Sequence, residues 1–591
     1  MSTRPSFLAE LKRRNVLRAG ALYIGAIWAL AQGIAQLAPV FAAPEWLPRW
    51  FAIAGILGFP FWLLFAWFFE LTPEGLKLER DVERHASITH ETGRKLDFWI
   101  IGVLSVAVVL LLTNQIVSRR GGDRVSSQSI AVLPLANDGG NVDEQYFSDG
   151  LSEDLIIALS HFVDLKVISR SSSFKFRDST EDSRAIGAKL GVAHLLEGSV
   201  RRVGDAVRIS ASLVHVADGS TLWSERYDRP YRDLFALQDE ISNAVAGALK
   251  AKLLASGTAA AQTDRPPSGN LDAYAAYLQA AFYGARGAET DHNEAVARYT
   301  KAIELDPHYA RAWAGLSVEW TGYAQQSLAG DAAQAAYAEA RKAAEKAVQL
   351  QPDLAAAYAA RSTLRRNGDF DWAGAESDAR RAVELAPNDG AAKFSLGVSL
   401  ATFGKPREAI ALTQQAIATN PMRASWQVWL SMYHSSLGEL DEAEAAVRKA
   451  IALQADGTAY YEMLTVIEIQ RGDAAAALDA AQKEPDESWR RMAFALARQI
   501  GDDRAAADAA LQELIDKDAS LAAWPIAEVY ALRRDGNKTF EWLERTWANR
   551  DPGITGLLTD PFILRYRDDP RFAAFCKKVG LPATTEAKAL P

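Results

Sequence analysis

Cysteine is almost absent from the sequence, since Cys576 is the only one in 591 residues. A single cysteine excludes an internal disulfide and any zinc or iron–sulfur site that needs several thiolates. An excess of basic residues is also missing, because the net charge is −9 at pH 7. Phosphate binding depends on a basic surface. We therefore predict no nucleic-acid partner, no metal and no cofactor.

Familiar catalytic motifs are missing as well. The sequence has no Gly-x-x-x-x-Gly-Lys-Ser/Thr, Gly-x-Gly-x-x-Gly, His-Glu-x-x-His or Gly-x-Ser-x-Gly. These patterns mark sites for phosphate, dinucleotides, metalloprotease chemistry and ester hydrolysis, in that order. We name no catalytic, cofactor-binding or metal-binding residue, and ligand-binding residues are unknown at this point. The chain is predicted not to be an enzyme.

Long apolar runs, by contrast, are plentiful near the start of the chain. Residues 19–41, 50–69 and 98–117 contain no charged side chain, and each run is long enough to cross a bilayer as a helix. Tryptophan and phenylalanine residues gather near their borders, as they do at membrane interfaces. The pattern predicts a membrane domain over residues 1–117 with three transmembrane helices, and membrane lipid as a partner.

The distribution of positive charge predicts an orientation for these spans. Ten lysine and arginine residues precede the first run or lie between the second and third, against four on the other side. Because such residues are retained in the cytoplasm, we expect a cytoplasmic N-terminus and periplasmic soluble domains in a bacterial inner membrane. A competing interpretation treats residues 1–42 as a cleaved signal peptide, given their basic start and the Val-Phe-Ala before Ala43.

A compact α/β domain is predicted over residues 129–254, between linkers at 118–128 and 255–270. Its elements follow from apolar periodicity and from turn residues. We expect strands at 129–135, 165–170, 195–202, 207–216 and 221–227, and helices after 150, at 183–190 and at 234–253. The last three strands form a meander in this prediction, and the final helix closes the domain.

Several segments of this domain resemble a known bacterial module. They are Ser-Ile-Ala-Val-Leu-Pro-Leu (129–135), Tyr-Phe-Ser-Asp-Gly-Leu-Ser-Glu-Asp-Leu (146–155), Leu-Glu-Gly-Ser-Val-Arg-Arg (196–202) and Leu-Trp-Ser-Glu-Arg-Tyr-Asp (222–228). The resemblance is to the amino-terminal domain of TolB and to the flagellar FlgO proteins. It implies an αβαβββα fold in an envelope or signalling context and supplies no catalytic residue. In relatives, a cyclase or winged-helix domain often precedes this module, and the apolar runs stand in that place here.

Three groups of polar residues in the domain invite a functional interpretation. Ser169 to Ser173, with Arg170, could bind an anion, but a serine-rich loop that bonds its own backbone is the simpler interpretation. The acidic residues near 150 are explained by helix capping. The histidines lack the spacing of metal ligands. The acidic residues are Asp149, Glu153 and Asp154, and the histidines are His161, His194 and His215.

A recurring helix ending dominates the second half of the chain. Pro307, Pro352, Pro387 and Pro421, and then Ala455, end similar segments at steps of 45, 35, 34 and 34 residues. This spacing, with Leu396-Gly397, Gly404, Ala409 and Ala416 in the best-kept unit, resembles the tetratricopeptide repeat, a stacked helix pair. The 45-residue step predicts longer helices or an insertion near 325–331. An ordinary alanine-rich helical bundle is the alternative.

We therefore predict a multi-domain membrane protein whose small α/β domain precedes an all-α tetratricopeptide superhelix at 271–520 and a C-terminal cap at 521–591. Stacked repeats bind other polypeptides, so the expected function is a membrane-anchored periplasmic scaffold whose concave surface holds proteins or peptides. Trp313, Tyr358 and Trp426 either line that surface or pack between repeats, and Cys576 is expected in the core. The alternative is an envelope receptor in which the α/β module senses a ligand and signals to a cytoplasmic partner. Oligomeric state and partner identity are not determined by the sequence.

Overall fold

The computed structural model describes most of the chain after residue 125. The described residues are 126–139, 145–162, 165–249, 265–284, 289–328, 330–519 and 522–590, together with 20, 23–24, 27, 58–62, 69–72 and 75–78. The chain divides into two units, Met1–Arg124 and Val125–Pro591. Each unit is described by itself.

The first unit contains a short antiparallel hairpin of β1 (Phe69–Thr72) and β2 (Gly75–Leu78). Among the residues that the structure describes, none of the helices combines the length and the apolarity that a membrane crossing requires. The predicted membrane domain and the predicted inner-membrane location are therefore contradicted. Those predictions rested on apolar length, on aromatic residues at the borders and on the distribution of lysine and arginine. Apart from residues 20, 23–24, 27, 58–62 and 69, the runs 19–41, 50–69 and 98–117 lie outside the described residues.

The second unit begins with a mixed sheet. Its strands are β3 (Ser129–Val132), β4 (Ala136–Asn137), β5 (Lys166–Val167), β6 (His194–Val203), β7 (Ala206–His215) and β8 (Thr221–Pro230). The order is β5-β3-β6-β7-β8, with β4 pairing β6. The pairs β3–β5 and β3–β6 are parallel, and β6–β7–β8 is an antiparallel meander. The predicted meander is confirmed by the pairing of its strands, and the central strand β7 alternates between more and less buried positions over most of its length.

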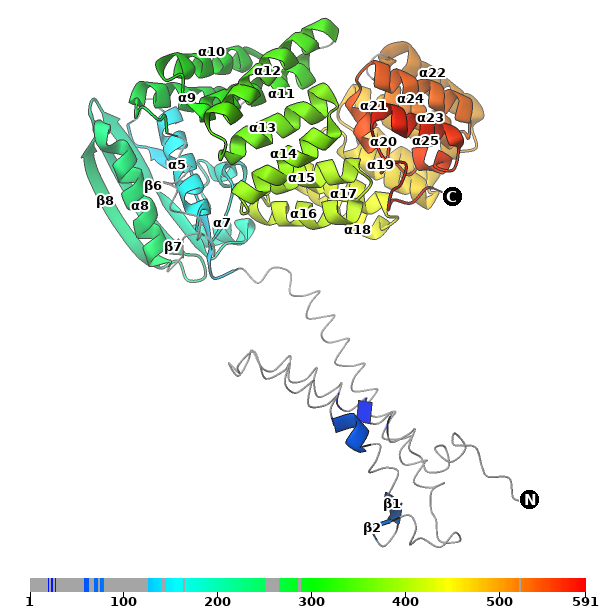
Figure 1. Ribbon diagram of the computed structural model, residues 1–591, viewed down its shortest axis with the longest axis horizontal. Helices are drawn as coiled ribbons and strands as arrows, with labels where there is room; N and C mark the ends of the chain where they lie inside the picture. The colour runs from blue at the N-terminus through cyan, green and yellow to red at the C-terminus, as the bar shows by residue number, and fades with distance from the viewer. Residues whose placement is uncertain are drawn as a thin grey trace. The chain divides into compact units, whose positions relative to one another are not determined.

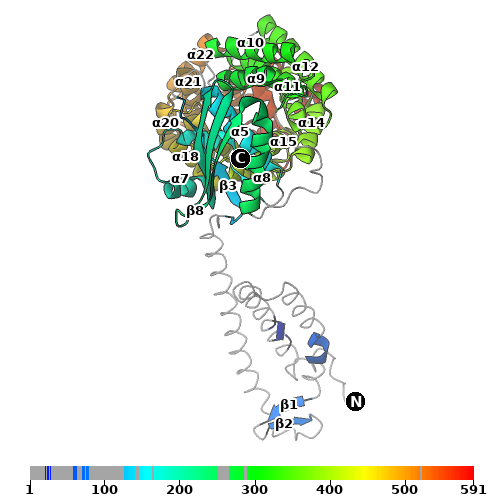
Figure 2. The same cartoon turned by 90° about the vertical axis from the view of Figure 1, so that its left-hand side faces the viewer.

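Helices cover both faces of this sheet (Figure 2). Four helices belong to the domain: α5 (Gln145–Ser160), α6 (Arg170–Ser173), α7 (Ser183–Leu190) and α8 (Leu234–Ala248). The apolar side chains of α5 and α8 share one core with Ile130 and Ile209, whereas α7 packs on Ala131 and Leu195 from the opposite face. The predicted second strand is shorter than expected, since the chain turns into α6 at Arg170.

Helix pairs follow the α/β domain along the chain. Their bounds are α9 (Leu271–Gly284), α10 (Glu289–Leu305), α11 (Ala310–Ser327), α12 (Gly330–Leu350), α13 (Ala355–Leu364), α14 (Trp372–Leu385), α15 (Gly390–Thr402), α16 (Pro406–Thr419), α17 (Ala424–Ser436), α18 (Leu440–Leu453), α19 (Tyr460–Arg471), α20 (Ala474–Lys483), α21 (Glu487–Ala497), α22 (Arg504–Asp518), α23 (Ala523–Leu532) and α24 (Gly536–Ala548). Consecutive helices pack as antiparallel pairs, and α11 to α18 lie side by side in chain order (Figure 1). The repeat superhelix is shown, and the simple-bundle alternative fails.

Small residues hold each pair close together. Ala409 and Ala416 on α16 are fully buried, and a side chain at Gly397 would meet the Ala409 carbonyl oxygen at 3.3 Å. Gly404 and Gly438 take positive φ values of 74° and 71° at the turns, where glycine has no steric penalty. The turn near Gly368 differs from these two, because the chain forms a π-helical turn (Arg365–Asp369) and the residue with positive φ is Phe370.

The 45-residue step comes from longer helices, as one of the two predicted explanations has it. Helices α11 and α12 have 18 and 21 residues, against 13 and 14 in α15 and α16. After α24 the chain forms 3-10 turns at Pro552–Gly556 and Ile563–Tyr566 and then α25 (Pro570–Val579). Cys576 is fully buried there, and burial raises the pKa of its thiol to about 11. It is a core residue, as predicted.

Candidate protein-interaction surface

A shallow hollow lies beside the longest helix of the array. Its volume is about 650 Å³, and its lining consists of Trp313 from α11 and one stripe of α12 residues: Ala338, Arg341, Lys342, Glu345, Lys346 and Gln349. These α12 positions recur at three- and four-residue steps, so they share one face of the helix. We call this face the α12 stripe.

The α12 stripe is predominantly basic. Three cations face one carboxylate, that of Glu345. Arg341 is paired with Asp369 across the repeat, which leaves its guanidinium fixed in place. Lys342 is exposed and lies 3.9 Å from Glu339, whereas Lys346 donates a hydrogen bond to Gln349 at 3.3 Å. The two lysines therefore present positive charge to solvent.

Trp313 closes one side of the hollow. Its indole N–H donates to the Pro307 carbonyl oxygen at 3.2 Å, which fixes the ring, and the side chain is only half-buried. Of the three aromatic residues considered from the sequence, Tyr358 bonds the Pro352 carbonyl oxygen in the same way. Trp426 is buried and stacks on Phe394 at 4.9 Å between ring centroids. Trp426 therefore packs between repeats, which is one of the two predicted roles, and Trp313 lines the hollow.

The serine run of the α/β domain contacts the repeats. The Ser169 backbone N–H donates to the Thr419 carbonyl oxygen at 2.8 Å, and the side-chain amide of Asn420 donates to the Ser171 hydroxyl at 2.6 Å. The Ser172 hydroxyl donates to Asn420 and accepts from the Met422 N–H. These hydroxyls are occupied by the loop between α16 and α17. The anion-binding interpretation is thus not favoured, and the run joins two parts of one body.

The carboxylates near residue 150 are not helix caps, which corrects the sequence-based interpretation. Helix α5 begins earlier, at Gln145, so Asp149, Glu153 and Asp154 lie within it. Asp149 accepts from Arg177 at 2.7 Å, and Glu153 lies 3.1 Å from Arg170. Asp154 accepts from Gln238 on α8 and from Tyr274 on α9. Their role is to tie α5 to its neighbours, including the first repeat helix.

The three histidines do not form a metal site. His194 and His215 face each other with ring centroids 5.5 Å apart, and burial lowers the pKa of His194. His161 is apart from them, and burial lowers its pKa as well. Within the described ranges no group of three or more metal-binding side chains is found.

A buried carboxyl cluster at the C-terminal end was missed by sequence reasoning. Glu462 on α19, Glu528 on α23 and Asp560 come from segments far apart in the chain. Burial is the main cause that raises the pKa of all three, and neighbouring carboxylates add to it for the two glutamates. The pKa of Glu462 reaches about 8. Asp560 also accepts from the N–H groups of Phe562 and Ile563, so the cluster anchors the 3-10 segment to the repeats.

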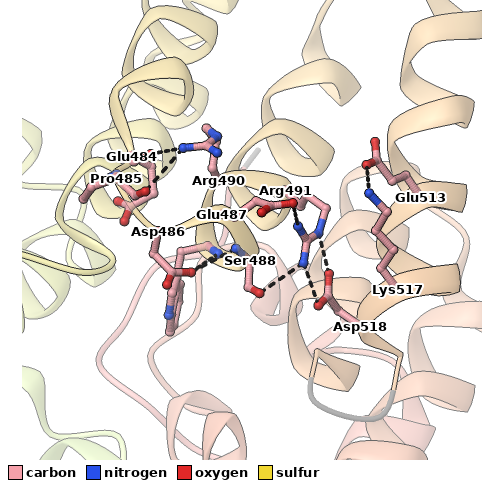
Figure 3. A network of polar contacts seen from close by, with 11 residues as sticks. Glu484, Pro485, Asp486, Glu487, Ser488, Arg490, Arg491, Glu513, Lys517 and Asp518 are labelled. Atoms are coloured by element: carbon pink, nitrogen blue, oxygen red, sulfur yellow. Dashed lines mark hydrogen bonds and ion pairs between the residues drawn. The ribbon is translucent and has the colours of Figure 1, made fainter.

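An ion-pair network joins α21 to α22 (Figure 3). Arg491 reaches Asp518 with its Nε at 2.8 Å and its terminal nitrogen at 3.0 Å, a two-pronged contact that suits guanidinium and carboxylate geometry. The hydrogen bond to Asp518 raises the pKa of Arg491. Arg490 donates to the carbonyl oxygens of Glu484 and Pro485, where α20 has ended. The network is structural, since its partners satisfy one another.

Comparisons with known proteins agree with this architecture in part. A model of the second domain of HilA/YgeH-like transcriptional regulators matches residues 126–244. A tetratricopeptide repeat model matches residues 427–456, which correspond to α17 and α18, so the chain contains tetratricopeptide repeats. The likeness to TolB and FlgO is not the match found here and stays a prediction.

Relatives and solved structures cover limited parts of the chain. It is 38% identical over 213 residues to putative adenylate cyclase 3 of Rhizobium meliloti (strain 1021), covering 34% of this chain and 35% of that protein. It therefore spans about a third of that relative's length. The pilus biogenesis factor PilW has 17% identity and a TM-score of 0.31 over 36% of this chain and 98% of PilW. The repeat protein TTC0263 of Thermus thermophilus has 18% identity and a TM-score of 0.27 over 35% of this chain and 99% of that chain. No functional conclusion follows from similarities at these TM-scores.

Proposed function

We propose that the chain is a non-catalytic protein-interaction scaffold that holds an acidic segment of another polypeptide on the α12 stripe. The observation that carries this proposal is the hollow itself, in which a half-buried tryptophan stands beside a row of cations. Tryptophan and arginine are the residues enriched where protein interfaces gain most of their binding energy. A shallow, open surface of this kind suits a protein segment better than a small molecule.

Electrostatics selects the class of partner. Lys342 and Lys346 supply charge that an acidic segment complements, whereas the guanidinium of Arg341 is already paired with Asp369. The body behind the stripe is stiff, because α11 and α12 pack along their length and the α/β domain is bonded to the repeats at Tyr274 and Asn420. A preorganised surface loses less entropy on binding. These features support a docking platform.

The test uses fluorescein-labelled 12-residue peptides, one acidic and one basic, with matched apolar content. We expect the acidic peptide to bind, with an affinity that falls as salt rises, because exposed charges are screened. The double variant Lys342→Glu, Lys346→Glu should weaken binding by about tenfold or more. The matched control reverses two exposed lysines outside the hollow, Lys301→Glu and Lys449→Glu. Equal binding of both peptides, or equal losses in both variants, would refute the assignment.

A further inference from the structure

The segment after α25 runs across the repeats without forming a helix. The backbone N–H groups of Glu586, Lys588 and Leu590 donate to the carbonyl oxygens of Gly404, Ser436 and Pro561 at 3.0, 2.7 and 2.8 Å. The donors are alternate residues, which is the spacing of an extended strand whose N–H groups point to one side. The first two acceptors belong to the turns that end α15 and α17. Figure 1 draws this segment in dark red beside α17.

The carbonyl groups that it contacts are ready acceptors. The Ser436 carbonyl group is the last of α17, and the last carbonyl groups of a helix have no partner within the helix, whereas the Gly404 carbonyl group lies in the turn that follows α15. The Thr585 hydroxyl adds a bond to the Leu558 carbonyl oxygen at 2.6 Å. We call this row of acceptors the turn track. Most of its contacts are to the main chain of the segment, and the Glu586 carboxylate also accepts from the Arg407 N–H at 3.4 Å.

Side chains of the segment meet the track at alternating positions. Ala587 is 3% exposed, Thr585 and Ala589 are half-buried, and Glu586 and Lys588 between them are exposed. A larger residue at Gly404 is excluded, because a side chain there would lie 2.9 Å from the Thr584 carbonyl oxygen. The track thus admits an extended chain with small residues facing inward and charged residues facing out.

We propose that the turn track is a second binding site, for extended peptides with small residues at alternate positions, and that residues 581–590 occupy it in cis. The mode is recognition of a strand by main-chain hydrogen bonds, with shallow places for alternate side chains. A partner segment of the same pattern displaces the chain's own. Because a tethered segment has an effective concentration of about 1 mM, only a partner that binds more tightly or is locally concentrated gains access. This site is separate from the α12 stripe and does not depend on it.

The experiment removes residues 581–591 from the chain and supplies them as a separate peptide. A chain ending at Gly580 is titrated into a labelled peptide of residues 581–591, and binding is followed by fluorescence anisotropy. We expect saturable binding to the shortened chain and binding at least ~100-fold weaker to the intact chain. The same peptide with Ala587→Asp, and a scrambled peptide, should bind the shortened chain at least ~10-fold less well than the native peptide.

A second variant covers the case in which shortening disturbs the fold. Ala587→Asp in the intact chain introduces a charge at a buried position. It should release the segment from the turn track without shortening the chain. The native peptide should then bind this variant. Absence of binding to both folded variants, or equal binding by the intact chain, would overturn the proposal. Loss of folding in both variants would overturn it too, since the segment would be a required part of the fold.

Discussion

The two ends of the repeat array bury their apolar surface in different ways. Around α11 to α14 the cores are small and built mainly from alanine, as in the cluster of Ala310, Ala314 and Leu354. From α19 onward a single large core gathers the repeat helices, the 3-10 turns and α25 around aromatic residues such as Phe562. The repeats around α12 leave the α12 stripe open, whereas the C-terminal repeats close around an inserted segment and also contact Trp372 on α14. One fold thus leaves an open face at α12 and forms a closed core at the C-terminal end.

The largest expected effect comes from breaking the closed core. Phe562→Ala removes a fully buried ring and should lower the free energy of unfolding by about 3–5 kcal/mol. Leu354→Ala in the alanine-rich cluster should cost about 2–3 kcal/mol and affect mainly the N-terminal repeats, since repeats are coupled to neighbours. Urea unfolding followed by circular dichroism measures both. Equal losses with a single shared transition would contradict the contrast between the two ends.

Ion pairs should show the same contrast. Arg491→Ala leaves the carboxylate of Asp518, whose side chain is 9% exposed, without its partner. We expect a loss of about 2–3 kcal/mol. Arg341→Ala, whose side chain is 42% exposed beside Asp369, should cost less than about 1 kcal/mol. Thermal unfolding of both variants measures the two losses of stability. A larger loss for Arg341→Ala would show that side-chain exposure does not determine the strength of these ion pairs.

The buried carboxyl cluster predicts a pH dependence confined to the closed end. Glu462 has a raised pKa of about 8 in the folded chain, so folding favours its protonated form. Its stabilising contribution is fully present below the unfolded pKa near 4.5 and is lost as pH rises through about 8. Glu462→Gln should therefore gain at least about 1 kcal/mol relative to the native chain at pH 8 and little at pH 4. Parallel stability curves for the two proteins between pH 4 and 8 would refute this.

A comparably small effect is expected where the α/β domain meets the repeats. Asn420→Ala removes the partner of Ser171 and Ser172 and should cost about 1 kcal/mol, without unfolding either part. Hydrogen exchange should show faster exchange at the Ser169 N–H, which donates to Thr419 next to the changed residue. Unchanged exchange would mean that the junction does not depend on this contact.

The sequence predicted local features well and long-range features poorly. The repeat period, the meander and the glycine at position 404 were predictable because each depends on residues close in the chain. The return of residues 586–590 to Gly404 and Ser436 was not, since main-chain acceptors leave no pattern in the sequence. The cluster of Glu462, Glu528 and Asp560 was likewise hidden. Each of these residues is an ordinary surface type until the fold brings the three together.

Apolar length misled the prediction at the start of the chain. The three runs there contain no charge, yet no membrane-crossing helix is found among the described residues. The prediction for the acidic residues near 150 was wrong for a similar reason. Helix caps and ion pairs between helices both use acidic residues, so the sequence pattern alone does not distinguish the two. Only the start of α5 at Gln145 separates the two.

The most direct test of the scaffold proposal is photo-crosslinking from the α12 stripe in cells that make the protein. A photoreactive amino acid at Ala338, in the hollow, is compared with one at the exposed Ala445 on α18. The account predicts a crosslink from position 338 to an acidic segment of another protein, absent from position 445 and lost when Lys342 and Lys346 are reversed to glutamate. The same crosslinks from both positions, or persistence of the crosslink after charge reversal, would contradict it.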